Sequence, residues 1–193
     1  DLNAYNDNLL KSETVYDGLG RTTESRQYEG GTDFIAVRQV PFVILQDGAN
    51  WLVASQTSNP FRPYLGEQPV WTTSFLDALS RVIKVKTPDS SIVTTSYSGN
   101  TVTVTDQIGK KRKSVTDALG RLREVYEDPT GVNYLTSYSY DALDNLATVT
   151  QDTQTRTFVY DSLKRLKSAT NPEVCNQVGS QCTPIPVTYE YDN

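Results

Sequence analysis

The side chains of this chain that could do chemistry are carboxylates, four of which lie close together in the sequence: Glu124, Glu127, Asp128 and Asp141. Two carboxylates held roughly 5–9.5 Å apart can hydrolyse a glycosidic bond, one as acid and the other as base or nucleophile. Nothing in this spacing fixes such a pair, and acidic residues at turns and strand ends are normally solvated. We therefore predict that the chain is not an enzyme and carries no catalytic residue.

Other reaction centres are excluded by what the sequence lacks. Histidine is absent and cysteine occurs twice. This rules out a Ser-His-Asp or Cys-His nucleophile system, a histidine-ligated metal and a zinc cluster. We expect no metal and no cofactor.

Charge and hydropathy also limit the partners. Lys and Arg number 18 against 23 Asp and Glu, a net charge of -5, so nucleic acid is not an expected partner. The basic run 110–113 is interpreted as a solvated turn or strand edge. No apolar run approaches the roughly 20 residues of a membrane span. Since the chain begins at Asp1 and contains no Met, we expect a piece of a longer polypeptide.

The composition favours β-strands over helices. Ser and Thr make up 40 of the 193 residues and Tyr contributes 12, and β-branched and aromatic side chains fit a pleated, half-buried surface. Alternating segments 91–97 and 101–105 flank Ser98–Asn100, which predicts a hairpin with a short turn. No stretch has a sustained helical period.

A five-residue unit that starts with Asp recurs six times, at intervals of mostly 20–31 residues. Every copy has Leu or Ile two residues after the Asp, three have Gly at the next position, and five then have Arg or Lys. Tyr precedes the Asp in several copies. The copies are 17–21, 77–81, 106–110, 117–121, 141–145 and 161–165, and the residues predicted to form these turns are Asp17, Gly20, Arg21, Asp77, Arg81, Asp106, Gly109, Asp117, Gly120, Arg121, Asp141, Asp161 and Arg165.

This unit has the chemistry of a tight turn. An Asp side chain can accept hydrogen bonds from backbone amides two or three residues on, and Gly supplies a positive φ at no steric cost. Ser80 and Lys164 fit that conformation less well, so those two turns are expected to differ. We expect the Leu or Ile to fold back against the strands as an apolar plug. Asp47 is interpreted as a degenerate copy.

The segment at about 28–74 departs from the repeat and is rich in aromatic residues and Pro. Its subsegments 34–37 and 42–45 are predicted strands, and the second is expected to be covered because it is apolar on both faces. Exposed aromatic rings here would stack on sugar rings, whereas the competing and favoured interpretation is that they fill a thin sheet with little other core. The candidate glycan contacts are Trp51, Phe61, Tyr64 and Trp71.

Cys175 and Cys182 flank a Gly-Ser tip that lets the chain double back. We predict a local disulfide between them, although the spacing also permits two free thiols.

The repeated Tyr-Asp units, Tyr140-Asp141-Ala142-Leu143 and Tyr160-Asp161-Ser162-Leu163 among them, resemble the YD repeat of RHS-repeat proteins. That family includes shell subunits of insecticidal toxin complexes and the extracellular region of teneurins. The resemblance implies an all-β fold of tandem hairpins in a curved antiparallel sheet, an arc of a spiral shell, tube or barrel. It covers nearly the whole chain, 1–193, which we treat as a single run of repeats.

The resemblance also implies a structural role. We expect a non-catalytic wall segment of a secreted or cell-surface protein, which encloses a toxin or other cargo or forms a surface scaffold. The expected partners are neighbouring repeats of the same chain or identical copies, with an enclosed toxin polypeptide or surface glycans as further candidates. Two alternatives stay open, a fibre or tube that assembles through open sheet edges, and a carbohydrate-binding or adhesion module.

Overall fold

The computed structural model describes residues 11–178 and 181–192, which form β-strands joined by turns and one 3-10 helix, η1 (Pro63–Leu65). None of the described helices is long and apolar enough to cross a membrane. The strands are β1 (Ser12–Tyr16), β2 (Thr22–Gly30), β3 (Asp33–Asp47), β4 (Asn50–Ser58), β5 (Trp71–Leu76), β6 (Val82–Lys86), β7 (Ile92–Ser98), β8 (Thr101–Thr105), β9 (Lys111–Thr116), β10 (Leu122–Glu127), β11 (Tyr134–Tyr140), β12 (Leu146–Gln151), β13 (Gln154–Tyr160), β14 (Leu166–Val178) and β15 (Gln181–Thr188).

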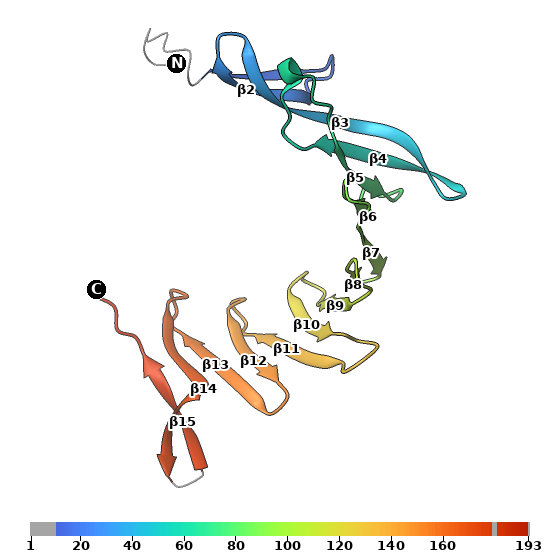
Figure 1. Cartoon of the computed structure of the whole chain (residues 1–193). Helices are drawn as coiled ribbons and strands as arrows, with labels where there is room; N and C mark the ends of the chain where they lie inside the picture. Colours follow the sequence, from blue (N-terminus) through green and yellow to red (C-terminus); the bar gives the residue numbers. More distant parts are fainter. Residues whose placement is uncertain (1–10, 179–180, 193) are drawn as a thin grey trace. The chain divides into compact units, whose positions relative to one another are not determined.

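The strand order in the sheet is the order in the sequence, and the pairs are antiparallel. Each strand therefore forms a hairpin with the next one, as the run β11 to β14 shows (Figure 1). The prediction of an all-β chain of antiparallel hairpins is confirmed. The curvature of the sheet stays a prediction.

The chain divides into two compact units, Asp1–Thr95 and Ser96–Asn193. The first contains the segment predicted at about 28–74. There, β3 is 15 residues long and pairs with β2 through its first half and with β4 through its second half. The loop after β4 returns to β3, because Phe61 and Ala36 exchange two backbone hydrogen bonds of 2.8 and 3.0 Å.

The buried core is small in both units. The buried apolar side chains are Ala36, Ala54, Phe61 and Phe75 in the first unit, and Val125 and Ala169 in the second. Such a core cannot hold a globule together by burial alone, so the fold depends heavily on strand pairing and on the turns.

One face of the predicted strand 42–45 is open. Phe42 is 57% exposed and Ile44 is 55% exposed. They alternate with Val43 and Leu45, and alternate residues of a strand point to opposite faces. The expectation that both faces are covered is therefore wrong for the face of Phe42 and Ile44.

Candidate functional site: the aspartate-led turns

Seven turns in the described residues share one backbone geometry. In each, the amide of the first residue donates to the carbonyl of the fifth, and the amide of the fourth donates to the carbonyl of the first. The fourth residue has a left-handed backbone, with φ between 61° and 84°. The turns start at Asp17, Asp77, Thr87, Asp106, Asp117, Asp141 and Asp161.

The carboxylate of the leading Asp closes the turn. In the turn 117–121, Oδ1 of Asp117 accepts from the amides of Leu119 at 2.9 Å and Arg121 at 3.0 Å. Its Oδ2 accepts from Nε of Arg121 at 2.7 Å. The same three bonds occur in the turns that start at Asp17, Asp77 and Asp161. Both carboxylate oxygens are thus engaged inside their own turn.

Two turns vary the fifth position and keep the two amide bonds to Oδ1. In the turn of Asp141, the side-chain amide of Asn145 replaces the guanidinium and donates to Oδ2 at 2.8 Å. In the turn of Asp106, the ammonium of Lys110 instead pairs with Asp128 at 3.2 Å. The backbone amides, which any residue supplies, are therefore the constant part of the turn.

The hydrogen bonds lower the pKa of five leading aspartates below the ordinary value of 3.8. For Asp17, Asp77 and Asp161 the main cause is the backbone amide of the Arg four residues on, followed by its guanidinium. For Asp141 the side chain of Asn145 comes first. For Asp117, burial acts to raise the pKa, but the bonds from Arg121 outweigh it. Carboxyl groups held ionised in this way are poor general acids near neutral pH.

The turns led by Asp77 and Asp161 were expected to differ, and this expectation is wrong. Ser80 has φ 61° and Lys164 has φ 63°, the same left-handed conformation as Gly120 at 80°. A left-handed residue with a side chain is strained by roughly 1–2 kcal/mol. The hydrogen bonds around it hold the backbone there.

Asp47 does not form a turn of this kind. It ends β3 before the short hairpin turn to Asn50, and its carboxylate binds Nζ of Lys84 at 2.7 and 2.8 Å. The interpretation of Asp47 as a degenerate copy is wrong.

The turn 87–91 was missed by the sequence comparison because Thr87 stands in place of the Asp. Here Asp89 supplies the carboxylate, which accepts from the hydroxyl of Thr87 at 2.5 Å and from the amide of Ser91 at 3.1 Å. The Thr-Pro-Asp-Ser sequence carries turn chemistry that could have indicated it.

The Leu or Ile of each Asp-led turn is not a plug. It lies at the apex of the turn, beyond the ends of the paired strands. The exposed fraction of its side chain ranges from 48% for Leu143 to 79% for Leu19. The expectation that these residues fold back against the strands is wrong, because the apex points away from the strands that would cover it. The other members are Leu79, Ile108, Leu119 and Leu163.

The Tyr before an Asp links one turn to the previous one. Tyr140 lies under the guanidinium of Arg121, whose Cζ is 4.7 Å from the ring centroid, and its hydroxyl donates to the carbonyl of Leu122 at 2.8 Å. Tyr191 repeats both contacts with Arg165 and with the carbonyl of Leu166. The Tyr-Asp pair and the turn Arg thus form one connected unit.

Turns that are neighbours in space also pair by charge. In the second unit, Arg121 donates through Nη1 to Oδ1 of Asp144, which belongs to the next turn at the same end of the strands. Lys164 of the turn after that helps to lower the pKa of Asp141. Each turn is therefore closed by its own hydrogen bonds and also interacts by charge with the next turn at the same end of the strands.

The leading aspartates of the second unit are spread over the sheet. Successive turns lie alternately at the two ends of the strands. The turns led by Asp117, Asp141 and Asp161 therefore lie at one end of the strands, and the turn of Asp106 lies at the other. Neighbouring turns at the same end are two strands apart, roughly 10 Å. They are separate turns and form no common cleft.

The remaining candidate carboxylates are engaged in separate contacts. Glu124 accepts from the hydroxyl of Tyr126 at 2.9 Å, which raises the pKa of Tyr126. Glu127 pairs with Arg112 at 2.7 Å. Glu124 and Glu127 are three residues apart in β10 and so point to opposite faces. No group of three or more Cys, Asp or Glu side chains among the described residues is placed to hold a metal ion.

The structure does not gather the four candidate glycan contacts. Trp71 of β5 lies opposite Ser58 of β4 and shares its face of the sheet. Trp51 is also in β4, seven residues before Ser58, and an odd separation along a strand places two side chains on opposite faces. The two indoles therefore lie on opposite faces. Phe61 is 5% exposed and belongs to the core, beneath the guanidinium of Arg38. The hydroxyl of Tyr64 donates to Glu29 at 2.9 Å.

A disulfide joins Cys175 to Cys182 across the hairpin of β14 and β15, with 5.4 Å between the Cα atoms. In the register of this hairpin, Cys175 lies opposite Pro184 and Cys182 lies opposite Gln177. The bond therefore crosses the ladder diagonally, close to the tip of the hairpin.

Comparison with known protein families finds one match, which covers a segment of the second unit. Residues 117–156 match the model of the RHS repeat. The chain carries an RHS repeat. The matched segment begins at the leading Asp of the turn 117–121 and includes Tyr140 and the turn 141–145. The RHS repeat thus coincides with the unit of turn, Arg and Tyr described above.

Two solved structures are similar to the chain over 96% of its length. One is the Photorhabdus luminescens Tc holotoxin pore, at 14% identity and a TM-score of 0.37. The other is the crystal structure of TcdB2-TccC3-TEV, at 12% identity and a TM-score of 0.34. The chain spans 14% and 15% of the length of those two chains. None of the curated proteins matches it.

Proposed function

We propose that this chain is a non-catalytic wall segment of an RHS-repeat protein, in which rows of hairpins enclose or hold a polypeptide cargo such as a toxin. The parent protein is secreted or stands on the cell surface. The cargo and the extracellular location are what the resemblance to the RHS family implies, and the match at 117–156 supports that resemblance.

One observation carries the structural role. The leading carboxylates of the repeated turns accept hydrogen bonds from backbone amides of those same turns. Oδ1 of Asp161 accepts from two backbone amides and Oδ2 from the guanidinium of Arg165. A carboxylate committed in this way fixes the turn, since three of its roughly four acceptor sites are already filled by its own turn.

The small core supports the same role. A sheet with six buried apolar side chains among its described residues presents most of its area on its two faces and edges. A thin sheet is suited to separating two spaces, whereas a compact globule is suited to burying a reaction centre.

Protease protection tests the proposal. The parent protein is treated with a nonspecific protease, and the survival of polypeptide segments outside the repeats is followed by mass spectrometry. We expect protection of one cargo segment in the native protein and in the control variant Asp152→Asn, and its loss in the double variant Asp117→Ala/Asp161→Ala. Digestion of all non-repeat segments at the same rate in native and denatured protein would contradict the proposal.

The fibre and the glycan-binding alternatives stay predictions. No contact between described residues favours either over the wall, and the candidate glycan aromatics are dispersed.

A further inference from the structure

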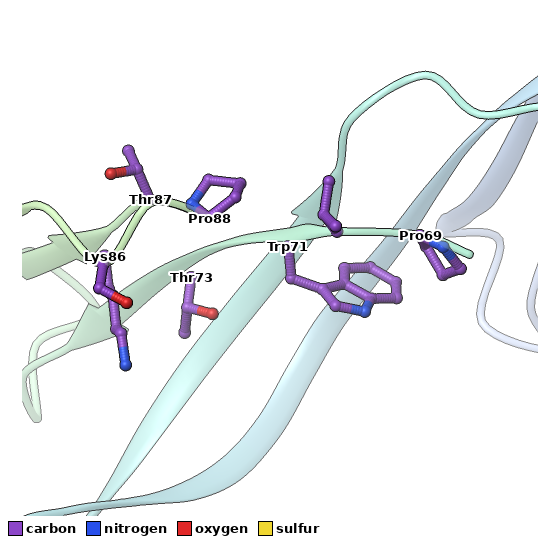
Figure 2. A pocket seen from close by; sticks show the side chains of 8 residues that line it. Pro69, Trp71, Thr73, Lys86, Thr87 and Pro88 are labelled. Atoms are coloured by element: carbon purple, nitrogen blue, oxygen red, sulfur yellow. The ribbon is translucent and has the colours of Figure 1, made fainter. Parts of the chain in front are cut away.

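An open cavity of about 390 Å³ lies in the first unit at the start of β5. Figure 2 shows Trp71 and Pro69 on one side of it, Lys86, Thr87 and Pro88 on the other, and Thr73 between them. The remaining lining residues are Val70 and Ser90.

The cavity results from a difference in strand length. Thr73 of β5 pairs with Lys86, the last residue of β6, whereas β5 begins two residues earlier at Trp71. The chain beyond Lys86 enters the turn 87–91 instead of continuing the ladder. Trp71 lies on the same face as Thr73 and has no β6 residue opposite it, so its indole borders open space.

The hydroxyl groups of the cavity are largely occupied. Oγ1 of Thr73 accepts from Nε2 of Gln56 at 3.0 Å. The hydroxyl of Thr87 donates to Asp89 at 2.5 Å. Few groups are therefore left to bind a ligand that presents many hydroxyls, as a sugar does.

Two polar groups of the cavity do remain available. Within the described ranges, neither Nε1 of Trp71 nor Nζ of Lys86 has a hydrogen-bonding or ion-pair partner. Lys86 is also the only charged residue that lines the cavity in this part of the chain. A ligand would thus meet one N–H donor, one positive charge and apolar walls from Pro69, Val70 and Pro88.

We propose that this cavity binds an extended, proline-rich peptide segment that carries an acidic residue. Aromatic-lined grooves accept proline-rich segments in the polyproline conformation, which is preformed and needs few side-chain hydrogen bonds. Trp71 supplies the ring face and a donor for a peptide carbonyl, and Lys86 selects the acidic residue by charge. This site does not depend on the wall function, since its ligand need not be the enclosed cargo.

The two Trp residues make the site directly observable. A ¹⁵N-correlated NMR spectrum of the chain contains two indole N–H signals, and the variant Trp51→Phe assigns them. The probe is the acetylated peptide Pro-Pro-Glu-Pro-Pro amide, and the matched control replaces its Glu with Lys. We expect a saturable shift of the Trp71 signal with the Glu peptide while the Trp51 signal, from the opposite face, stays in place.

The variant Lys86→Glu tests the charge. Lys86 is exposed at the end of β6, so the variant should keep the backbone spectrum of the native chain. It should weaken the Glu peptide roughly fivefold or more and favour the Lys peptide instead. Three results would overturn the proposal. The first is equal or absent shifts of both indole signals, and the second is equal affinity of the native and Lys86→Glu chains for the Glu peptide. The third is a shift of the Trp71 signal with the acidic polysaccharide polygalacturonate but not with the Glu peptide.

Discussion

The guanidinium of Arg121 lies over the ring of Tyr140, with Cζ 4.7 Å from the ring centroid, although 18 residues separate them in the chain. Arg121 closes one Asp-led turn, and Tyr140 precedes the Asp of the next turn at the same end of the strands. The Asp and the Arg thus stabilise one turn, and the Tyr connects it to the next. These contacts matter because the sheet has few buried apolar side chains.

Removal of the leading carboxylate should destabilise the fold. Asp117→Ala loses the two hydrogen bonds that the carboxylate accepts from backbone amides, and the contact with the guanidinium of Arg121. By analogy with a lost helix cap in a chain of this size, the thermal midpoint should fall by roughly 2–6 °C. Differential scanning calorimetry measures it. The control Asp152→Asn, in the turn between β12 and β13, should leave the midpoint unchanged, and an equal effect of both variants would contradict the role of the turn.

Glycine matters in these turns through its backbone. Gly20 has φ 75° and Gly18, in the same turn, does not have a positive φ, while both have open space where a Cβ would lie. Gly20→Ala should therefore cost about 1 kcal/mol of unfolding free energy, with Gly18→Ala near neutral. Urea denaturation of the two variants compares them. A similar loss in both would mean that the left-handed backbone is not what the turn requires.

The tyrosine contact should be measurable by a single hydroxyl. Tyr140→Phe removes the hydrogen bond to the carbonyl of Leu122 and keeps the ring, so it should cost about 1 kcal/mol. Tyr160 also precedes a leading Asp, but its hydroxyl has no partner among the described residues, and Tyr160→Phe should cost less. The ring is tested by Tyr140→Leu, which in combination with Arg121→Gln should lose less than the sum of the two single losses, because the two side chains are in contact. Strict additivity would show that the ring and the guanidinium act independently.

Stability should fall in acid because of the turn carboxylates. The pKa values of Asp17, Asp77, Asp117, Asp141 and Asp161 are lowered from 3.8. The unfolded chain therefore binds more protons than the folded one around and below that pH. The contribution is complete above the ordinary pKa and is lost as the pH falls through the lowered values. Urea denaturation from pH 6 to pH 2.5 should show this, with a shallower dependence of the unfolding free energy on pH for Asp117→Asn/Asp161→Asn than for the native chain. An equal dependence for both would contradict the role of these carboxylates.

Part of this architecture could be predicted from the sequence. The Asp, Gly and Arg of the turn 117–121 act through bonds between residues at most four apart, and local chemistry of that kind is visible in the sequence. The hairpins follow in turn, because a tight turn between alternating segments forces the chain back beside itself.

Other features depend on what surrounds each residue. Ser80 and Lys164 adopt a backbone that their own preferences disfavour, since the hydrogen bonds around them decide. The exposure of Leu119 depends on its position at the apex of the turn, beyond the ends of the paired strands. The cavity beside Trp71 depends on where β6 ends, and strand ends are among the least predictable features of a sequence.

The central claim is that each leading carboxylate is held by hydrogen bonds from the backbone of its own turn. The most direct test is a pH titration of the aspartate carboxyl carbons by ¹³C NMR, assigned with the single Asp→Asn variants. We predict that Asp17, Asp77, Asp117, Asp141 and Asp161 each titrate as an independent group below 3.8. A biphasic, coupled titration of two of them, or one that ionises near neutral pH, would contradict the account.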